Sequence, residues 1–381
     1  MVTARLPGTV ADAHSTATAA PDPAPAPVWR PDDEPSGWRS WAGRVVHHPV
    51  VLRLAQVPVV AFVVTIIVFL VAHLLPGDPV TQLTANVNGI TPEEVAQLTS
   101  QLGLDAGLAD QLRSYLVGLL HGQMGISFYS GASVSSMLAD ALPATVELAV
   151  AAVLLAGLLG IVTGIVAART QGTWVDHLIR GGATIGFSVP WFVVALVAIL
   201  VFGVWLGWLP ILGRLPTSLT YEPTTGFVLV DAVLQGRPDL IGPWLEHLAL
   251  PALTLAVTSA GFITRVTRTA FLDAQAQQWV RTARMKGLTE SAISVKHVLR
   301  NASVPILTIV GLMFGGLLGG AVVTEAVFSY PGVGSLLVEA VTRRDYFVLQ
   351  GSALVIALMF TGVNALVDLS VLAVDPRLRR G

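Results

Sequence analysis

Six long stretches without a charged side chain dominate this sequence. A helix needs about 20 predominantly apolar residues to cross the hydrocarbon core of a bilayer, and each stretch approaches or exceeds that length. The sequence therefore predicts an all-α membrane protein with six transmembrane helices. The predicted spans are Leu54–Ala72, Leu148–Ala168, Ala183–Leu209, Leu248–Thr264, Ala302–Thr324 and Phe347–Val367.

The composition excludes several other classes of protein. Only 12% of the residues are charged and 53% are hydrophobic, whereas soluble domains carry about 25% charged residues. The formal net charge of −2 gives no basis for binding nucleic acid. The absence of cysteine excludes disulfides, thiolate metal ligands and cysteine nucleophiles.

Lysine and arginine set the predicted orientation in the membrane. With the N-terminus inside, 17 of the 22 basic residues fall in cytoplasmic segments and 5 fall in outer segments. Cytoplasmic loops of membrane proteins carry an excess of such residues. We therefore expect a multi-pass protein with both termini in the cytoplasm.

The sequence divides into four parts. Residues 1–44 are rich in proline and alanine and lack an apolar run, which predicts a disordered cytoplasmic tail. Residues 45–140 hold the first span and an extracytoplasmic segment, in which Thr91–Leu120 has the periodicity of short amphipathic helices. Residues 141–375 hold the other five spans, and residues 376–381 form a cytoplasmic tail.

The longest predicted cytoplasmic loop, residues 274–302, is also the most basic region. Ala274–Lys286 is predicted to be a helix with cations in its last turns, where they favour the negative end of the helix dipole. Gly287 follows at the position where a left-handed residue ends a helix. Thr289 is predicted to cap a second helix, which carries an apolar stripe over residues 288–299.

Two interpretations of this loop are open. A basic loop can serve only to set membrane topology. However, caps, a turn glycine and an apolar stripe are unnecessary for that purpose, and amphipathic helices commonly seat in grooves of partner proteins. We therefore favour docking onto a cytoplasmic partner.

The segments Trp279–Gly287 and Lys296–Ala302 closely resemble the coupling loop of dipeptide/oligopeptide ABC importer permeases, in particular the first of their two permease subunits. The resemblance covers about residues 45–380. Further motifs occur in the expected order: Pro76–Pro79, Leu102–Asp105, Gly122–Ser127, His247–Thr254, Glu325–Gly334, Arg344–Tyr346 and Asp375–Arg377.

This resemblance implies a type I ABC importer permease that forms half of a pathway for peptides or similar small solutes in the plasma membrane of a prokaryote. The implied partners are a second homologous permease subunit, two ATP-binding subunits or domains, an extracytoplasmic solute-binding protein and membrane lipid. ATP and Mg²⁺ would bind in the ATP-binding partners, because this chain has no G-x-x-x-x-G-K-[ST] motif. The chain is thus expected to be a transport subunit with no cofactor and no enzyme activity. The residues expected to couple to the ATPase are Arg281, Thr282, Ala283, Arg284, Lys286, Gly287, Leu288, His297, Arg300 and Asn301.

Several polar or small residues in the spans are further candidates. Gly311, Gly315 and Gly319 recur every four residues, which predicts a ridge for close helix packing. Glu325 is either a structural anchor or a residue of the solute pathway. For Asn364 and Asp368 we expect pairing with a neighbouring helix, or with a Lys or Arg at the cytoplasmic end, rather than a proton relay. Isolated histidines without a second ligand at metal spacing predict no metal site.

The alternative function is an ion-coupled secondary transporter or channel that needs no ATPase. Such proteins have ionisable residues near the middle of the membrane and often contain internal repeats. The centres of the six predicted spans carry no Asp, Glu, Lys or Arg, and no repeat is found. These observations favour the importer.

Overall fold

A computed structural model describes residues 49–74, 91, 93, 99–100 and 106–374. The described residues are helical apart from connecting turns and one isolated bridge between Ile126 and Ser133, in agreement with the all-α prediction. Four predicted features lie outside the described residues: the tails 1–44 and 376–381, and the motifs Pro76–Pro79 and Leu102–Asp105. Asp375–Arg377 lies outside them as well.

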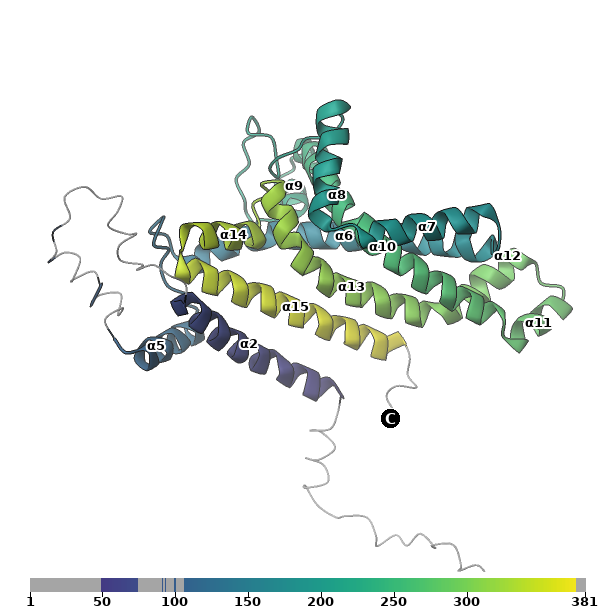
Figure 1. The fold of residues 1–381 in the computed structure, drawn as a ribbon, viewed down its shortest axis with the longest axis horizontal. Helices are drawn as coiled ribbons and strands as arrows, with labels where there is room; N and C mark the ends of the chain where they lie inside the picture. The colour runs from purple at the N-terminus through teal and green to yellow at the C-terminus, as the bar shows by residue number, and fades with distance from the viewer. Residues whose placement is uncertain (1–48, 75–90, 92, 94–98, 101–105, 375–381) are drawn as a thin grey trace, which may run out of the picture. The chain divides into compact units, whose positions relative to one another are not determined.

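The helical segments follow one another along the chain and keep the labels of Figure 1. They are α2 (Pro49–Leu74), α5 (Leu108–Leu120), α6 (Val134–Arg169), α7 (Trp174–Ser188), α8 (Trp191–Ala198), η2 (Ile199–Trp205), α9 (Val228–Leu234), η3 (Pro238–Leu240), α10 (Ile241–Gln275), α11 (Gln278–Met285), α12 (Glu290–Ala292), η4 (Ile293–Val298), α13 (Leu299–Val327), α14 (Val333–Arg343) and α15 (Tyr346–Val374).

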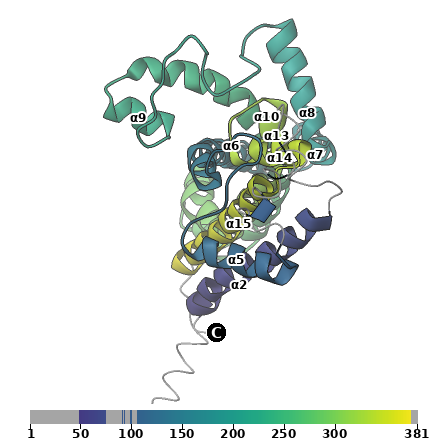
Figure 2. The ribbon, with the colours of Figure 1, turned by 90° about the vertical axis from the view of Figure 1, so that its left-hand side faces the viewer.

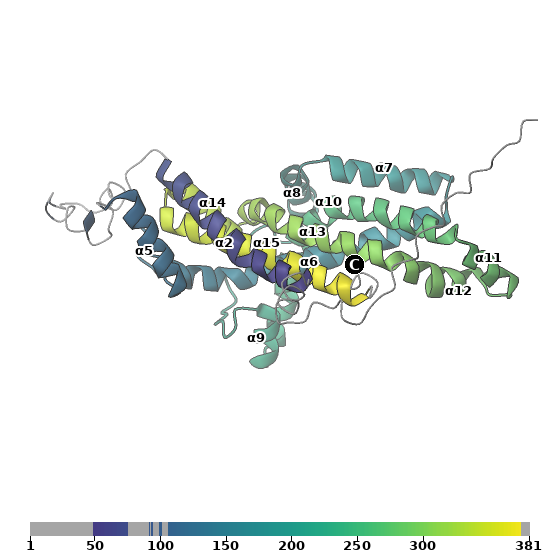
Figure 3. The same cartoon turned by 90° about the horizontal axis from the view of Figure 1, so that it is seen from below.

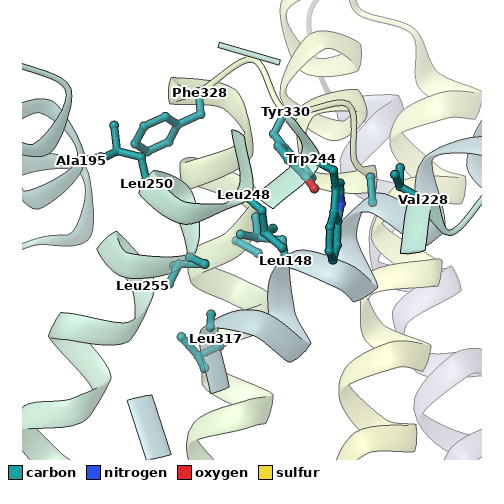
Figure 4. Close-up of a cluster of buried hydrophobic side chains, with 14 of the residues drawn as sticks. Leu148, Ala195, Val228, Trp244, Leu248, Leu250, Leu255, Leu317, Phe328 and Tyr330 are labelled. Atoms are coloured by element: carbon teal, nitrogen blue, oxygen red, sulfur yellow. The ribbon is translucent and has the colours of Figure 1, made fainter. Parts of the chain in front are cut away.

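Three long helices, α6, α10 and α13, pack against one another. Leu148 of α6, Leu248 of α10 and Leu317 of α13 belong to one buried apolar cluster (Figure 4). Farther along, an added Cβ on Gly160 of α6 would lie 2.6 Å from Ile263 of α10. Small residues of this kind let helix backbones approach closely in membranes, where apolar burial alone does not drive association.

The helix α2 runs beside α15, as Figures 1 and 3 show. Val68 of α2 packs in one apolar cluster with Val355 and Ile356 of α15. At the other side of α2, the rings of Phe69 and Tyr115 stack at 6.3 Å, which places α5 against α2. The first and last helices with described positions are therefore neighbours.

The third predicted span, Ala183–Leu209, is divided. The axes of α7 and α8 differ by 105° at a break beside Pro190. Proline has no N–H to donate, and the residue before it avoids the helical region. Val189 accordingly has extended backbone angles, φ −87° and ψ 129°. The bend is a feature that the apolar pattern alone does not predict.

Five of the six predicted stretches lie on single helical runs, and the third, Ala183–Leu209, is broken at Val189–Pro190 and extends beyond the helical end at Trp205. Among the described residues, four helical runs are long and apolar enough to cross a membrane, and the α7–α8 pair makes a fifth if it is one broken span. The helix α2 contributes a shorter apolar run, Gln56–Val71. A membrane-spanning bundle is thus present, whereas the exact count of six spans stays a prediction.

Candidate functional site

The coupling loop, residues 274–302, joins α10 to α13 at one end of the bundle (Figure 1). The predicted helix Ala274–Lys286 is wrong in one respect, because the chain breaks between the end of α10 and the start of α11. Gln277 at this break is extended, with φ −70° and ψ 149°. The break turns α11 so that Val280 packs in the same cluster as Phe271 of α10. Burial of Val280 is the physical reason for the division.

The turn after α11 has the predicted geometry. Gly287 is left-handed, with φ +78°, and its N–H donates to the Arg284 carbonyl oxygen at 2.9 Å. The Thr289 hydroxyl accepts a hydrogen bond from the Ala292 N–H at 3.3 Å, which makes it the N-cap of the next helix. The helical run that begins there continues through η4 and α13 without interruption.

The two faces of the coupling loop differ in character. Val280, Ile293 and Val298 are at most 1% exposed and form a small apolar cluster that fixes the loop to the end of α10. The predicted apolar stripe lies elsewhere, since Leu288 is 43% and Val295 is 60% exposed. Together with Met285, which is 81% exposed, these residues give the loop an apolar as well as a charged outer surface.

Most of the cations in this loop point outward without an acidic partner. Arg284 pairs with Glu290 at 2.6 Å. No acidic group among the described residues pairs with Arg281, Lys286, Lys296 or Arg300. The predicted coupling residues that are exposed are Arg281, Thr282, Arg284, Lys286, Gly287, Leu288, Arg300 and Asn301, whereas Ala283 and His297 are half-buried.

A second polar centre fixes the segment between η2 and η3, residues 206–237, which we call the Arg214 loop. Glu147 of α6 is its anchor: one carboxyl oxygen accepts from Arg214 at 2.6 Å and from the Trp244 indole N–H at 3.0 Å. The other oxygen accepts from the Val228 amide at 2.7 Å. The side chains of Arg214 and Glu147 are only 10% and 7% exposed.

Asp231 of α9 organises the same loop from within. Its carboxylate accepts hydrogen bonds from the Tyr221 hydroxyl, from the amide and hydroxyl of Thr225, and from the amides of Thr224 and Gly226. Burial raises the pKa of Asp231, but these hydrogen bonds outweigh that effect and hold the pKa well below its usual range. The loop around α9 therefore has its own polar centre, while Val228 of α9 packs in the apolar cluster of α6 and α10; Figure 2 shows α9 at one side of the helical bundle.

Two of the motifs noted in the sequence meet in space although 218 residues separate them. The Ser127 hydroxyl donates to the Asp345 carboxylate at 2.6 Å. Gly125, with φ +92°, packs so closely on the ring of Phe347 that an added Cβ would lie 2.7 Å from it. These motif residues thus fasten the segment before α6 to the start of α15.

Glu325 lies fully buried near the end of α13. One carboxyl oxygen accepts from the Ser335 amide at 3.1 Å, in the first turn of α14. Gly332 and Gly334 leave room for this carboxylate, since an added Cβ on either would collide with it. The other oxygen has no partner among the described residues. The contacts are those of an anchor for the α13–α14 turn.

The three glycines of the predicted ridge on α13 do not all pack against another helix. Gly311 and Gly315 approach α15 closely, the first at Val367 and the second at Asn364. Gly319 has no neighbour within 4 Å of an added Cβ. Asn364 thus lies at the α13–α15 contact, whereas the side chain of Asp368 is outside the described part of the structure.

Sequence reasoning missed the buried ion pairs. Besides Glu147 and Arg214, Asp176 of α7 accepts from Arg268 of α10 through both carboxyl oxygens, each at 2.8 Å. Each of these acidic residues lies at the edge of an apolar stretch. In the sequence, a charge at that position is readily explained by contact with water. Only the fold reveals that its partner lies 67 or 92 residues away.

The chain matches two family models. Residues 160–380 match the model described as "Binding-protein-dependent transport system inner membrane component". Residues 47–149 match the model described as "Binding-prot-dependent transport system membrane comp, N-term". Between them, the two matches include nearly all of the described helices.

Curated relatives align along most of the chain. The dipeptide transport system permease protein DppB of Escherichia coli K12 is 38% identical over 333 residues, covering 86% of this chain and 98% of its own length. The di/tripeptide transport system permease protein DppB of Pseudomonas aeruginosa is 39% identical over 318 residues, covering 84% and 94%. A solved structure of the MetNI methionine ABC transporter in an inward-facing conformation aligns with a TM-score of 0.46 at 16% identity, covering 63% of this chain and 96% of that one.

Proposed function

The chain belongs to the family of binding-protein-dependent transport system inner membrane components, and from that premise we propose that it carries short peptides. It is a multi-pass permease subunit of an ABC importer, and the ATPase is a separate subunit. Family membership favours this function over the ion-coupled transporter or channel. The names of the relatives support di- and tripeptides as the solutes.

The proposed complex contains this chain, a second homologous permease, two ATP-binding subunits or domains with ATP and Mg²⁺, and an extracytoplasmic solute-binding protein. The coupling loop would face the cytoplasm, with both chain termini on that side. The distribution of basic residues supports this orientation, because 17 of 22 would then lie inside.

The observation that carries the proposed mechanism is the construction of the coupling loop. Its inner face is fixed to α10 by Val280, Ile293 and Val298, and its outer face presents unpaired cations and exposed apolar groups. A cleft on the ATPase would hold this outer face. The uninterrupted helix from Glu290 to Val327 would then carry any displacement of the loop to the opposite end of the bundle as a rigid-body movement.

Uptake of a radiolabelled dipeptide by cells tests this function. Gly287→Pro removes the N–H that bonds to Arg284 and forbids the left-handed backbone, and Arg284→Glu reverses a cation on the docking face. Both variants should insert into the membrane at wild-type amounts and lose uptake. Unchanged uptake in both would contradict the coupling role.

A charge-reversal control separates docking from internal stability. The double variant Arg284→Glu/Glu290→Arg keeps an ion pair within the loop but moves the cation to the other helix. If the ATPase contacts Arg284, the double variant stays inactive. Recovery of uptake would instead show that Arg284 acts only within this chain.

A further inference from the structure

A hollow of about 750 Å³ lies between the end of α10, α11 and the start of α13, beside the coupling loop. Sites for small molecules typically have volumes of about 300–1,000 Å³. The polar and aromatic residues that line it are Phe262, Arg265, Thr269, Asp273, Gln277, Trp279 and Asn301. None of these except Asn301 belongs to the predicted coupling residues, and the mechanism above leaves the hollow without a function.

One wall of the hollow carries two opposite charges. Arg265, Thr269, Asp273 and Gln277 follow one another at four-residue spacing along α10 and the turn after it, which places them on one side of a helix. Neither the guanidinium of Arg265 nor the carboxylate of Asp273 has an ion-pair partner among the described residues. The neighbouring Arg268, by contrast, is fully engaged by Asp176.

The spacing of the two charges suits a short chain. Eight residues of α-helix separate Arg265 from Asp273, about 12 Å along the axis. An extended peptide covers about 3.4 Å per residue, so the charged ends of a chain of two to four residues can reach both groups.

The opposite wall supplies contacts for the body of a peptide. Trp279 of α11 offers an aromatic ring, and Asn301 of α13 offers an amide whose N–H already donates to the His297 carbonyl at 2.8 Å. The side-chain oxygen of Asn301 has no donor among the described residues. A peptide N–H can use it as an acceptor.

We propose that this hollow binds a short zwitterionic peptide, with its carboxylate on Arg265 and its ammonium group on Asp273. The inference rests on the proposed peptide transport and on the orientation that puts the coupling loop in the cytoplasm, and it adds a second solute site on the side where the peptide is released. Trp279 lies near the start of the coupling loop and Asn301 near its end. A bound peptide therefore links both ends of the loop to α10. Accumulated peptide would therefore slow further uptake.

Equilibrium dialysis of radiolabelled tri-alanine tests the site on the complete complex, extracted in detergent and washed free of solute-binding protein. The wild-type complex should bind it saturably. Arg265→Gln and Asp273→Asn should each weaken binding at least tenfold, since each loses one charged contact. Arg180→Gln, which removes an exposed cation of α7 outside the hollow, should bind as the wild type does.

A second test uses the wild-type complex alone, so it does not depend on the folding of a variant. It compares tri-alanine with derivatives in which one terminal charge is removed. On the wild-type complex, N-acetyl-tri-alanine and tri-alanine amide should each bind at least tenfold more weakly than tri-alanine. Equal binding of all three, or no saturable binding by a complex whose cells take up tri-alanine, would overturn the inference and leave the proposed function intact. Absence of tri-alanine uptake in wild-type cells would instead count against peptide transport itself.

Discussion

The coupling loop and the Arg214 loop lie at opposite ends of α10 and are held in different ways. The Arg214 loop is held by buried charges: Glu147 and Arg214 pair with each other, and Asp231 accepts hydrogen bonds from hydroxyls and backbone amides of the loop. The coupling loop is held by apolar contacts from Val280 and Ile293, and its one ion pair is exposed. Among the described residues, the coupling loop leaves four cations without an acidic partner, whereas the Arg214 loop leaves one charged group, the exposed carboxylate of Glu222, without an ion pair or a hydrogen bond.

The charges of the Arg214 loop are thus mostly satisfied within this chain, whereas most cations of the coupling loop are exposed and unpaired among the described residues. A buried charge whose partner is removed is strongly destabilising, so the Arg214 loop has little freedom to change. Exposed ion pairs add little to stability, so the coupling loop can exchange its solvent contacts for protein contacts at low cost. The first two of the following measurements contrast the two loops, and the last two examine the coupling loop alone.

Removing the acidic partner of each ion pair should give the largest contrast. Glu147→Ala leaves Arg214 buried without a counter-ion and should destabilise the protein by about 3–5 kcal/mol, which lowers the yield of extracted protein and its melting temperature. Glu290→Ala, which breaks the exposed pair with Arg284, should leave the melting temperature unchanged. Equal effects of the two substitutions would remove the distinction between the loops.

Acid should open the Arg214 loop before the coupling loop. Because the pKa of Asp231 is depressed in the native state, its stabilisation is complete above the ordinary carboxyl value of about 3.9 and is lost as the pH falls through the lower native value. Limited proteolysis across this range should show cleavage near Thr225 only at the acid end. In Asp231→Asn the same site should be cleaved at neutral pH, and continued protection there would show that the charge is dispensable.

Strain at the coupling turn should affect uptake more than stability. Gly287→Val forces a β-branched residue into a left-handed backbone at a cost of about 1–2 kcal/mol, with no neighbouring atom to collide with. Gly287→Asn is the matched control, since asparagine tolerates this conformation. Uptake should fall in the first variant and persist in the second, whereas a loss in both would point to a need for glycine's small size.

The smallest effect is expected at the helix cap. Thr289→Ala removes the side-chain acceptor for the Ala292 amide, which costs about 1 kcal/mol. The helix that follows is anchored by Ile293 and Val298, so hydrogen exchange should quicken at the first turn only. Exchange that spreads into α13 would show that the cap supports the whole helix.

Local features were predictable because they depend on neighbours in the sequence. The left-handed Gly287 and the Thr289 cap follow from residue type and position, and five of the six apolar stretches lie on unbroken helical runs. The break before α11 was not predicted, since its cause is the burial of Val280 against a cluster assembled from α10 and α13. The 105° bend had a local signal, Pro190, but proline alone does not distinguish a kink from a sharp reversal.

The side-chain pairs that link distant segments could not be predicted, for a different reason. Ser127 and Asp345, Glu147 and Arg214, and Asp176 and Arg268 each pair across long sequence separations. Nothing in the spacing of such residues identifies the partner, because the pairing depends on which helices become neighbours. Ser127 and Asp345 each lie in a motif noted in the sequence. The motifs did not show that these two residues contact each other.

The contact of α2 with α15 also orders events during synthesis. The apolar residue Val68 of the first described helix packs with Val355 and Ile356 of the last, so α2 is synthesised long before its packing partner. Contacts of such wide sequence separation form late and are slow to close. A newly made chain consequently presents an uncovered side of α2 until α15 has been synthesised and packs against it.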